Sequence, residues 1–318
     1  MNTLVLKLLA QRIALALLSL LAVSVIVFSI TAVLPGDAAQ EQLGQDVTPE
    51  ALAALRAKMG LDVPAPQRYA RWLLGMVQGD PGRSATTQMP VAELVASRLP
   101  NSLLLAAVTA LFSVPIALAL GIASAVWRGS WFDRAASTSA VAVVSVPEFL
   151  VATLAVLVFA VKLRWLPALS FVNDIESIGQ LLRAFAMPVL VLCCVIVAQM
   201  MRMTRAAVID QLEAPYVEMV TLKGASPLRT VLAHALPNAI GPIANAVALS
   251  LSYLLGGVII VETIFNYPGI AKLMVDGVTQ RDIPLVQACA MLFCAGYLIL
   301  VTTADVFGIV ANPRLRHR

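Results

Sequence analysis

Residues 239–261, AIGPIANAVALSLSYLLGGVIIV, carry no charged side chain over a length that can cross a lipid bilayer. A transmembrane helix needs about 20 mainly apolar residues, because hydrocarbon offers no partner for unpaired backbone groups. Other stretches of the chain meet the same requirement. The predicted spans are residues 13–34, 102–127, 137–161, 185–203, 239–261 and 285–310. The sequence therefore predicts an all-α integral membrane protein with six transmembrane helices.

The composition of the whole chain agrees with a membrane protein. Hydrophobic residues make up 60% of the 318 residues, charged residues make up 13%, and the mean hydropathy is +0.87. Soluble domains are about half apolar and about a quarter charged, so a water-soluble enzyme, a disordered tail and a fibrous protein are poor interpretations. The net charge of +4 comes mostly from cations beside apolar runs, which does not indicate nucleic-acid binding.

The distribution of cations predicts the orientation. Six spans place both termini on one side, and that side holds more Lys and Arg in its short loops, so both termini are expected in the cytoplasm. The first span has a longer apolar core than a signal peptide and is interpreted as a retained anchor. The predicted organisation is a first helix over residues 1–34, an extracytoplasmic segment over 35–101, a five-helix core over 102–310 and a cytoplasmic tail over 311–318.

The four cysteines lie inside apolar runs and are expected to be small buried core residues, with no disulfide framework and no metal site. They are Cys193, Cys194, Cys289 and Cys294.

The extracytoplasmic segment 35–101 is too patterned to be a plain connector. Short helices are predicted from Pro49 to about Gly60 and over residues 66–77, followed by a turn at residues 79–82. Two compatible interpretations remain, a compact cap on the bundle and a docking surface for an external partner.

The cytoplasmic segment 204–238 is more informative. Pro215 is expected to divide a helix, Gly224 to end it in a turn, Ser226-Pro227 to start another helix and Pro237 to kink it. The helix before Gly224 is unusually apolar for the water side, which is typical of a helix that binds a protein groove or lies on a membrane surface. Its charges are balanced, which favours a protein partner. The apolar residues are Tyr216, Val217, Met219, Val220 and Leu222.

At this loop the sequence resembles the permease subunits of bacterial ABC importers. Glu218, Gly224 and Leu236-Pro237 stand at the spacing of their cytoplasmic loop signature, with Met219-Val220 in place of two alanines. The run HALPNA at 234–239 resembles the dipeptide/oligopeptide/nickel branch. Further matching segments are LPGD at 34–37, GDPGRS at 79–84, RLPNS at 98–102, IFNYPG at 264–269, RDIP at 281–284 and NPRLR at 312–316.

The resemblance implies a B-type permease subunit with the type I ABC importer fold in a bacterial inner membrane. It also implies a second homologous permease, two cytoplasmic ATPase subunits and an extracytoplasmic solute-binding protein. Di- or oligopeptides are the expected substrates, with glutathione-like molecules, nickel chelates and other small solutes left open. The loop would be the coupling helix that contacts an ATPase. Its coupling residues would be Glu213, Tyr216, Glu218, Lys223, Gly224, Ser226, Pro227 and Arg229.

The chain has no G-x-x-x-x-G-K-[ST] motif, the loop that cradles nucleotide phosphates. It is therefore expected to be no enzyme and to bind no cofactor itself, with ATP and magnesium bound by the ATPase subunits.

Two further groups of residues are candidates for transport. Glu148 and the polar residues of the fifth span either line the pathway or make contacts between helices, and these polar residues are Asn245, Ser250, Ser252 and Tyr253. The outer loop 262–284 is expected to form a gate or to contact the binding protein. Its candidates are Asn266, Pro268, Gly269, Arg281 and Asp282.

An ion-coupled secondary transporter or channel that works without an ATPase is the alternative function. Internal repeats and buried coupling carboxylates would support it, and the halves of this sequence show no convincing repeat. An intramembrane protease is a poor interpretation, because His234 and His317 lie outside the spans and Asp305 has no intramembrane aspartate to pair with.

Overall fold

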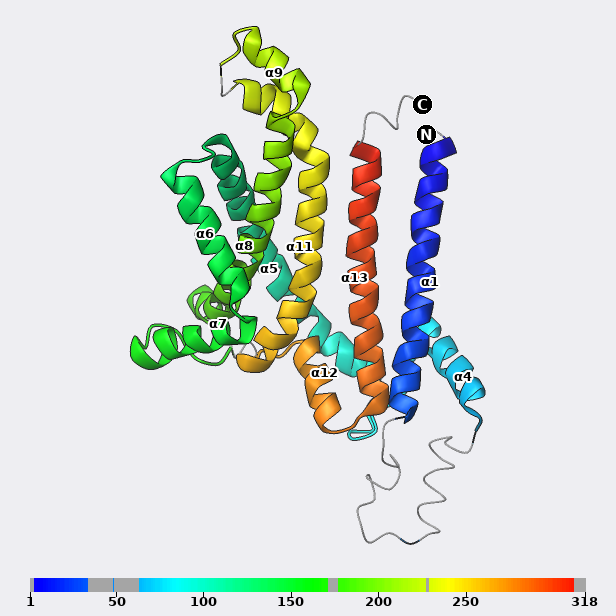
Figure 1. Cartoon of the computed structure of the whole chain (residues 1–318). Coiled ribbons are helices and arrows are strands. Elements are labelled where there is room, and N and C mark those ends of the chain that lie inside the picture. Colours follow the sequence, from blue (N-terminus) through cyan, green and yellow to red (C-terminus); the bar gives the residue numbers. More distant parts are fainter. Residues whose placement is uncertain (1–2, 34–47, 49–62, 171–176, 227–228, 312–318) are drawn as a thin grey trace. The chain divides into compact units, whose positions relative to one another are not determined.

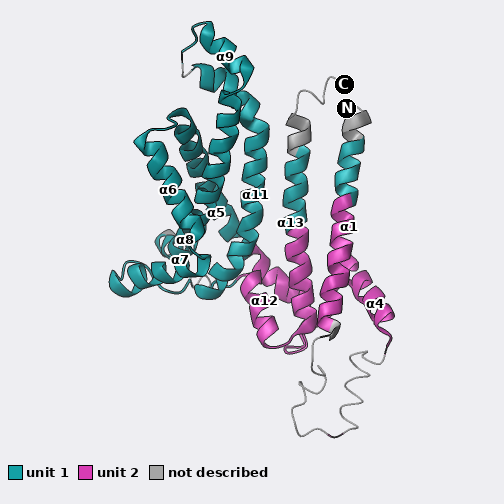
Figure 2. Cartoon of the chain, viewed as in Figure 1, with its two compact units in different colours: residues 1–14, 102–268, 297–318 teal, residues 15–101, 269–296 magenta. Residues whose placement is uncertain are grey.

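The structure is a computed structural model that describes residues 3–33, 48, 63–170, 177–226 and 229–311 (Figure 1). Apart from one isolated β-bridge between Arg83 and Pro90, the regular structure in these ranges is helical. The chain divides into two compact units (Figure 2). Unit 1 comprises residues 1–14, 102–268 and 297–318, and unit 2 comprises residues 15–101 and 269–296.

Within the residues that the structure describes, five helices are long and apolar enough to cross a membrane, in agreement with five of the predicted spans. They are α1 (Thr3–Val33), α5 (Val91–Val126), α8 (Ile178–Leu212), α11 (Leu236–Ile264) and α13 (Ile283–Ala311). Most extend beyond the predicted ends. The largest difference is in α5, which starts well before Ser102 and contains Pro100, because a proline inside a membrane helix is tolerated where neighbouring groups satisfy the freed carbonyl.

The predicted third span, residues 137–161, is not one straight helix. It consists of α6 (Trp131–Ser145) and a second piece, α7 (Glu148–Ala155) continued by the π-helix η1 (Val156–Lys162), and the two pieces are bent by 100°. Val146 between them has an extended backbone, φ −92° and ψ 129°. Proline disfavours the helical conformation of the preceding residue, so Pro147 forces the break. The described part of the chain therefore has six spans if this bent pair is counted as one, and five otherwise.

Unit 1 is organised around α8, which packs against α6 and α11 (Figure 1). A core cluster at one end of α8 is formed by buried residues of α5, α8 and α11, namely Ala125, Val208, Ile209 and Ala239. The contact between α5 and α8 is close, because a Cβ on Gly121 would lie 2.8 Å from the carbonyl oxygen of Met201. Of the four cysteines, all free thiols, Cys289 of unit 2 is buried, whereas Cys194 is exposed on the surface of the chain, against expectation.

Unit 2 contains parts of α1 and α13 together with α4 (Ala65–Gln78) and α12 (Ile270–Thr279). The helix α4 confirms the one predicted over residues 66–77, whereas the helix predicted from Pro49 lies outside the described residues. Gln287 of α13 donates a hydrogen bond to Thr31 of α1, with 2.6 Å between Nε2 and Oγ1. The buried core of this unit consists of Val91, Ile270, Leu285, Ala288 and Cys289.

The chain after α8 forms the short helix α9 (Pro215–Leu222) and then the π-helix η2 (Thr230–Ala235), which leads directly into α11. The predicted kink at Pro237 is wrong. Pro237 is the second residue of α11 and follows the π-helix η2 directly. The helical path from Thr230 to Ile264 is continuous.

Candidate functional site

The helix α9 begins and ends at the residues that the sequence indicates. Pro215 is its first residue, after Ala214 in an extended conformation. It ends in a Schellman motif, in which the Gly224 amide donates to the Thr221 carbonyl at 2.9 Å and the Ala225 amide to the Val220 carbonyl at 3.3 Å. Gly224 has a φ of +82°, which a residue with a Cβ adopts only at a cost.

One face of α9 is apolar and uncovered. Val217 is buried and attaches the helix to the rest of unit 1, whereas Met219 is 55% and Leu222 75% exposed. Tyr216 is partly exposed, and its hydroxyl donates to Oε1 of Gln211 at 3.0 Å. Figure 1 shows α9 at one end of unit 1, beyond the ends of α8 and α11. Such a surface is suited to a groove on a protein partner.

Two ion pairs fix the elements that carry α9. Asp133 of α6 is almost fully buried and accepts two hydrogen bonds from the Arg205 guanidinium of α8, at 2.6 and 2.8 Å. The same carboxylate accepts from the Gly129 amide at 2.9 Å. The second pair joins Arg128, after α5, to Glu213 at the end of α8, and both of its side chains are exposed. The first pair links α6 to α8, and the second links the chain after α5 to the end of α8, two residues before α9 begins.

The remaining candidates of segment 204–238 lie on α9 and around the turn at Gly224. Glu218, Lys223 and Arg229 are exposed, and the Ser226 carbonyl accepts from the Thr230 amide at 2.9 Å. Pro227 lies outside the described residues.

Glu148 lies at the first turn of α7, directly after the break in the third span. Its side chain packs on Gly257 of α11, where an added Cβ would collide with the carboxylate. Among the described residues, the Glu148 carboxylate has no hydrogen-bond or ion-pair partner. An unpaired carboxylate in a membrane helix is costly unless it meets water or a partner, so Glu148 stays a candidate for the pathway.

Adjacent glycines give a direct test of the Glu148 contact. Gly257→Ala is expected to displace the Glu148 side chain and to lower uptake by about fivefold, if the shift costs about 1 kcal/mol. Gly256→Ala is the matched control, because no atom lies within 4 Å of a Cβ there. Initial uptake rates at equal membrane content measure both, and equal rates for the two variants would show that the position of Glu148 does not matter for transport.

The polar residues of the fifth span do not form one stripe. Asn245 and Tyr253 are exposed on α11, whereas Ser250 and Ser252 are buried. The Ser252 hydroxyl donates to the Ala248 carbonyl at 2.9 Å, and the Ser250 hydroxyl has no partner among the described residues. The two serines therefore face the interior of unit 1, and their role in lining the pathway stays a prediction. Asn245 and Tyr253 remain candidates.

The outer loop contains exposed and buried candidates. Asn266 is exposed, with a positive φ of 49°, between the fully buried Phe265 and Tyr267. Pro268 is half-buried, and Gly269 is the buried N-cap of α12. Nearby, the buried Glu262 of α11 accepts a hydrogen bond from the Ser102 hydroxyl of α5.

Asp282 has no exposed surface in the isolated chain, and its role as a gate residue or a contact for the binding protein stays a prediction. Its carboxylate accepts from the Ser84 hydroxyl, from the Ala85 amide at 3.0 Å and from the Thr86 hydroxyl at 3.0 Å. A buried carboxylate persists where hydrogen bonds replace its hydration. Asp282 thus holds the loop before α5 onto the start of α13, while the adjacent Arg281 is exposed.

Comparison with known proteins gives the family. Residues 117–317 match the binding-protein-dependent transport system inner membrane component, and residues 5–106 match the N-terminal domain of such membrane components. The chain belongs to this family.

Relatives within the family cover nearly the whole chain. The glutathione transport system permease protein GsiC of Salmonella paratyphi A is 35% identical over 300 residues, which is 94% of this chain and 95% of the relative. GsiC of Escherichia coli K12 has the same identity and coverage. This chain is thus a multi-pass inner-membrane permease subunit of an ABC importer of the peptide/nickel group, working with ATPase and solute-binding subunits, rather than an ion-coupled carrier or channel.

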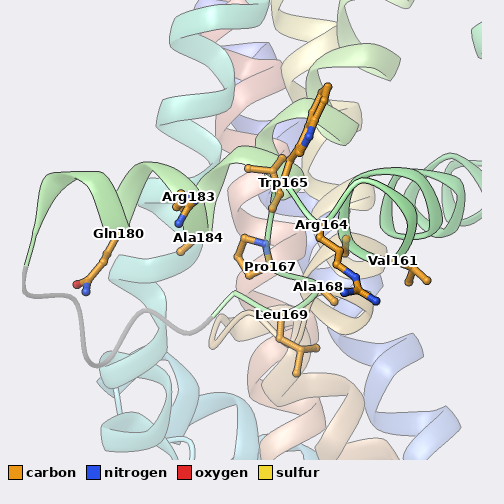
Figure 3. Close-up of a pocket in the computed structure, with 11 residues that line it drawn as sticks. Val161, Arg164, Trp165, Pro167, Ala168, Leu169, Gln180, Arg183 and Ala184 are labelled. Carbon is orange, nitrogen blue, oxygen red and sulfur yellow. The ribbon is translucent and has the colours of Figure 1, made fainter.

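The permease also has a cavity that sequence reasoning did not identify. It has a volume of about 570 Å³ and lies in unit 1, between the end of η1 and the start of α8 (Figure 3). Arg164, Trp165, Gln180 and Arg183 are among its lining residues. Arg164 has a positive φ of 55°, which no sequence signal indicates.

The ion pair between Asp133 and Arg205 was missed as well. A usable signal was present, because Asp133 follows the Gly129-Ser130 turn and is the acidic residue of the first turn of α6.

Proposed function

We propose that this permease imports short peptides or glutathione-related solutes. The support is the similarity over nearly the full chain to permeases named for glutathione transport, together with the peptide-branch motifs of the loop. Uptake of labelled glutathione and of a labelled dipeptide, compared between cells with and without this subunit, tests the substrate class. A strain complemented with the gene confirms that the subunit is made. The proposal is contradicted if cells without the subunit take up glutathione and the dipeptide as fast as the complemented strain does.

We further propose that α9 is the coupling helix and docks in a groove of a cytoplasmic ATPase subunit, which binds the ATP and magnesium. The observation that carries this proposal is the uncovered apolar face of α9. The helix follows directly on α8, which the buried pair of Arg205 with Asp133 joins to α6. A helix attached in this way moves with α8 as a rigid body, so closure of the ATPases would reach the membrane helices.

A pair of charge insertions on α9 tests the docking. Met219→Asp places a carboxylate on the exposed apolar face and is expected to weaken ATPase binding by about tenfold or more, since a charge would be buried without a partner. Thr221→Asp adds the same charge at another exposed position of α9 and is expected to have little effect. Recovery of ATPase subunits with the tagged permease in mild detergent is the measurement, and equal recovery with both variants would contradict the docking.

A second permease is proposed to cover the exposed polar side chains of α11. Asn245 and Tyr253 lie within a membrane span and are exposed in the isolated chain, and polar groups facing lipid are costly. A second permease chain and the water-filled pathway between the two chains would solvate them. The proposed complex contains two ATPase subunits. Both termini of this permease are placed in the cytoplasm, which the cation distribution favours. Asn266 and Arg281 are proposed contacts for the binding protein.

A further inference from the structure

The helix α4 packs against α1 within the apolar part of α1. The Tyr69 and Ser24 hydroxyls are 2.7 Å apart, and the Phe28 ring contacts both Tyr69 and Trp72, with centroid distances of 5.4 and 5.8 Å. The membrane-spanning stretch of α1 runs over Lys7–Thr31, so Ser24 lies about 10 Å before its end at a rise of 1.5 Å per residue. Figure 2 shows α4 leaning on α1 in the same unit.

The face of α4 that does not contact α1 has an apolar row and a polar row of side chains. Ala70, Leu74 and Val77 follow each other at helical spacing, and Leu74 is 57% and Val77 78% exposed. A second row beside them is polar and also exposed. It consists of Gln67, Arg71 and Gln78.

We propose that α4 is embedded in the outer leaflet of the membrane, with the row of Ala70, Leu74 and Val77 in the acyl chains and Arg71 at the phosphate headgroups. Continuity of the lipid-facing surface from α1 to α4 supports this placement. The α1 side chains around the contact include the exposed apolar groups Leu21 and Val25, and a helix packed at this depth extends the same lipid-facing surface.

The charges of α4 fit lipid better than water alone. The helix carries Arg68 and Arg71 and no acidic residue, and long cationic side chains reach from the apolar boundary to phosphate oxygens. The Arg68 guanidinium lies 5.8 Å from the centre of the Phe28 ring, at the contact with α1. An apolar row beside a cationic one is the pattern of helices that lie in a membrane interface.

Spin labels on the two rows test this placement. Val77→Cys and Arg71→Cys are introduced separately into a chain whose native cysteines are replaced by alanine and which still supports uptake. Each nitroxide is measured in the assembled transporter in lipid nanodiscs, as collision rates with oxygen, which concentrates in hydrocarbon, and with a water-soluble nickel chelate. Leu74→Cys is a second probe of the apolar row.

Both positions are exposed in the isolated chain, so exposure alone predicts equal behaviour. The proposal predicts that oxygen collisions exceed nickel collisions severalfold for the label at position 77, and that the ratio reverses at position 71. Dominant nickel collisions at positions 74 and 77 would show that α4 lies in water. Protection of both labels from both reagents would show that the apolar row is covered by a protein subunit. Either result overturns the proposal.

Discussion

Replacing Gly224 by proline is expected to abolish ATP-driven uptake while the subunit still inserts into the membrane. Gly224 has a φ of +82° and closes the Schellman motif of α9, whereas proline is fixed near −65° and has no N–H to donate to Thr221. The variant must rebuild the turn, which tilts or frays the apolar face of α9. A loss of only 1.4 kcal/mol in productive docking already lowers uptake about tenfold, and we expect a larger loss.

The measurement is uptake and ATP hydrolysis by the same reconstituted complex. Gly224→Pro should retain basal hydrolysis or lose the ATPase subunits, with uptake lost in either case. Gly224→Asn is the matched control, because asparagine tolerates a positive φ and no atom lies within 4 Å of a Cβ at this position. Normal uptake by the proline variant would eliminate α9 as the coupling helix.

Removing the Asp133 carboxylate is expected to be the most destabilising single change at the base of the loop. Asp133→Ala leaves the half-buried Arg205 without its bidentate partner and the Gly129 amide without its acceptor. Breaking a buried pair on one side costs about 3 kcal/mol or more. We expect a melting temperature of the purified complex several degrees lower, and fewer molecules transported per ATP hydrolysed, since α6 no longer moves with α8.

The exposed pair between Arg128 and Glu213 gives the control for that experiment. Both side chains are more than half exposed, and exposed pairs contribute about 1 kcal/mol or less. Arg128→Ala should therefore shift the melting temperature much less than Asp133→Ala. If the two variants melt alike, the buried pair does not hold α6 to α8 as described.

Much of the fold could be predicted because it depends on local sequence. A span requires a sufficient apolar length, and five of the six predicted spans are straight helices close to the expected positions. The ends of α9 were predicted because Pro215 and Gly224 act through their own backbone conformations. The 100° bend at Val146 in the third span was not predicted, because the angle depends on what both pieces pack against.

The candidate site was less predictable wherever a side chain needs a distant partner. The sequence gives Asn245, Ser250, Ser252 and Tyr253 the same polar character, and only packing on α8 and its neighbours buries the two serines and exposes the other two. The residue type alone does not predict whether a polar side chain on a helix points into the bundle or out of it.

The sequence by itself determined the membrane-spanning helices and the glycine-ended helix α9, because hydrophobic length, proline and glycine act on the backbone near them. Its motifs carried the resemblance to importer permeases. Only the tertiary structure decided that Asp133 forms an ion pair with Arg205 and that Asp282 accepts a hydrogen bond from Ser84. These partners are separated by long stretches of chain, and a buried carboxylate is stable only where folding brings donors to it.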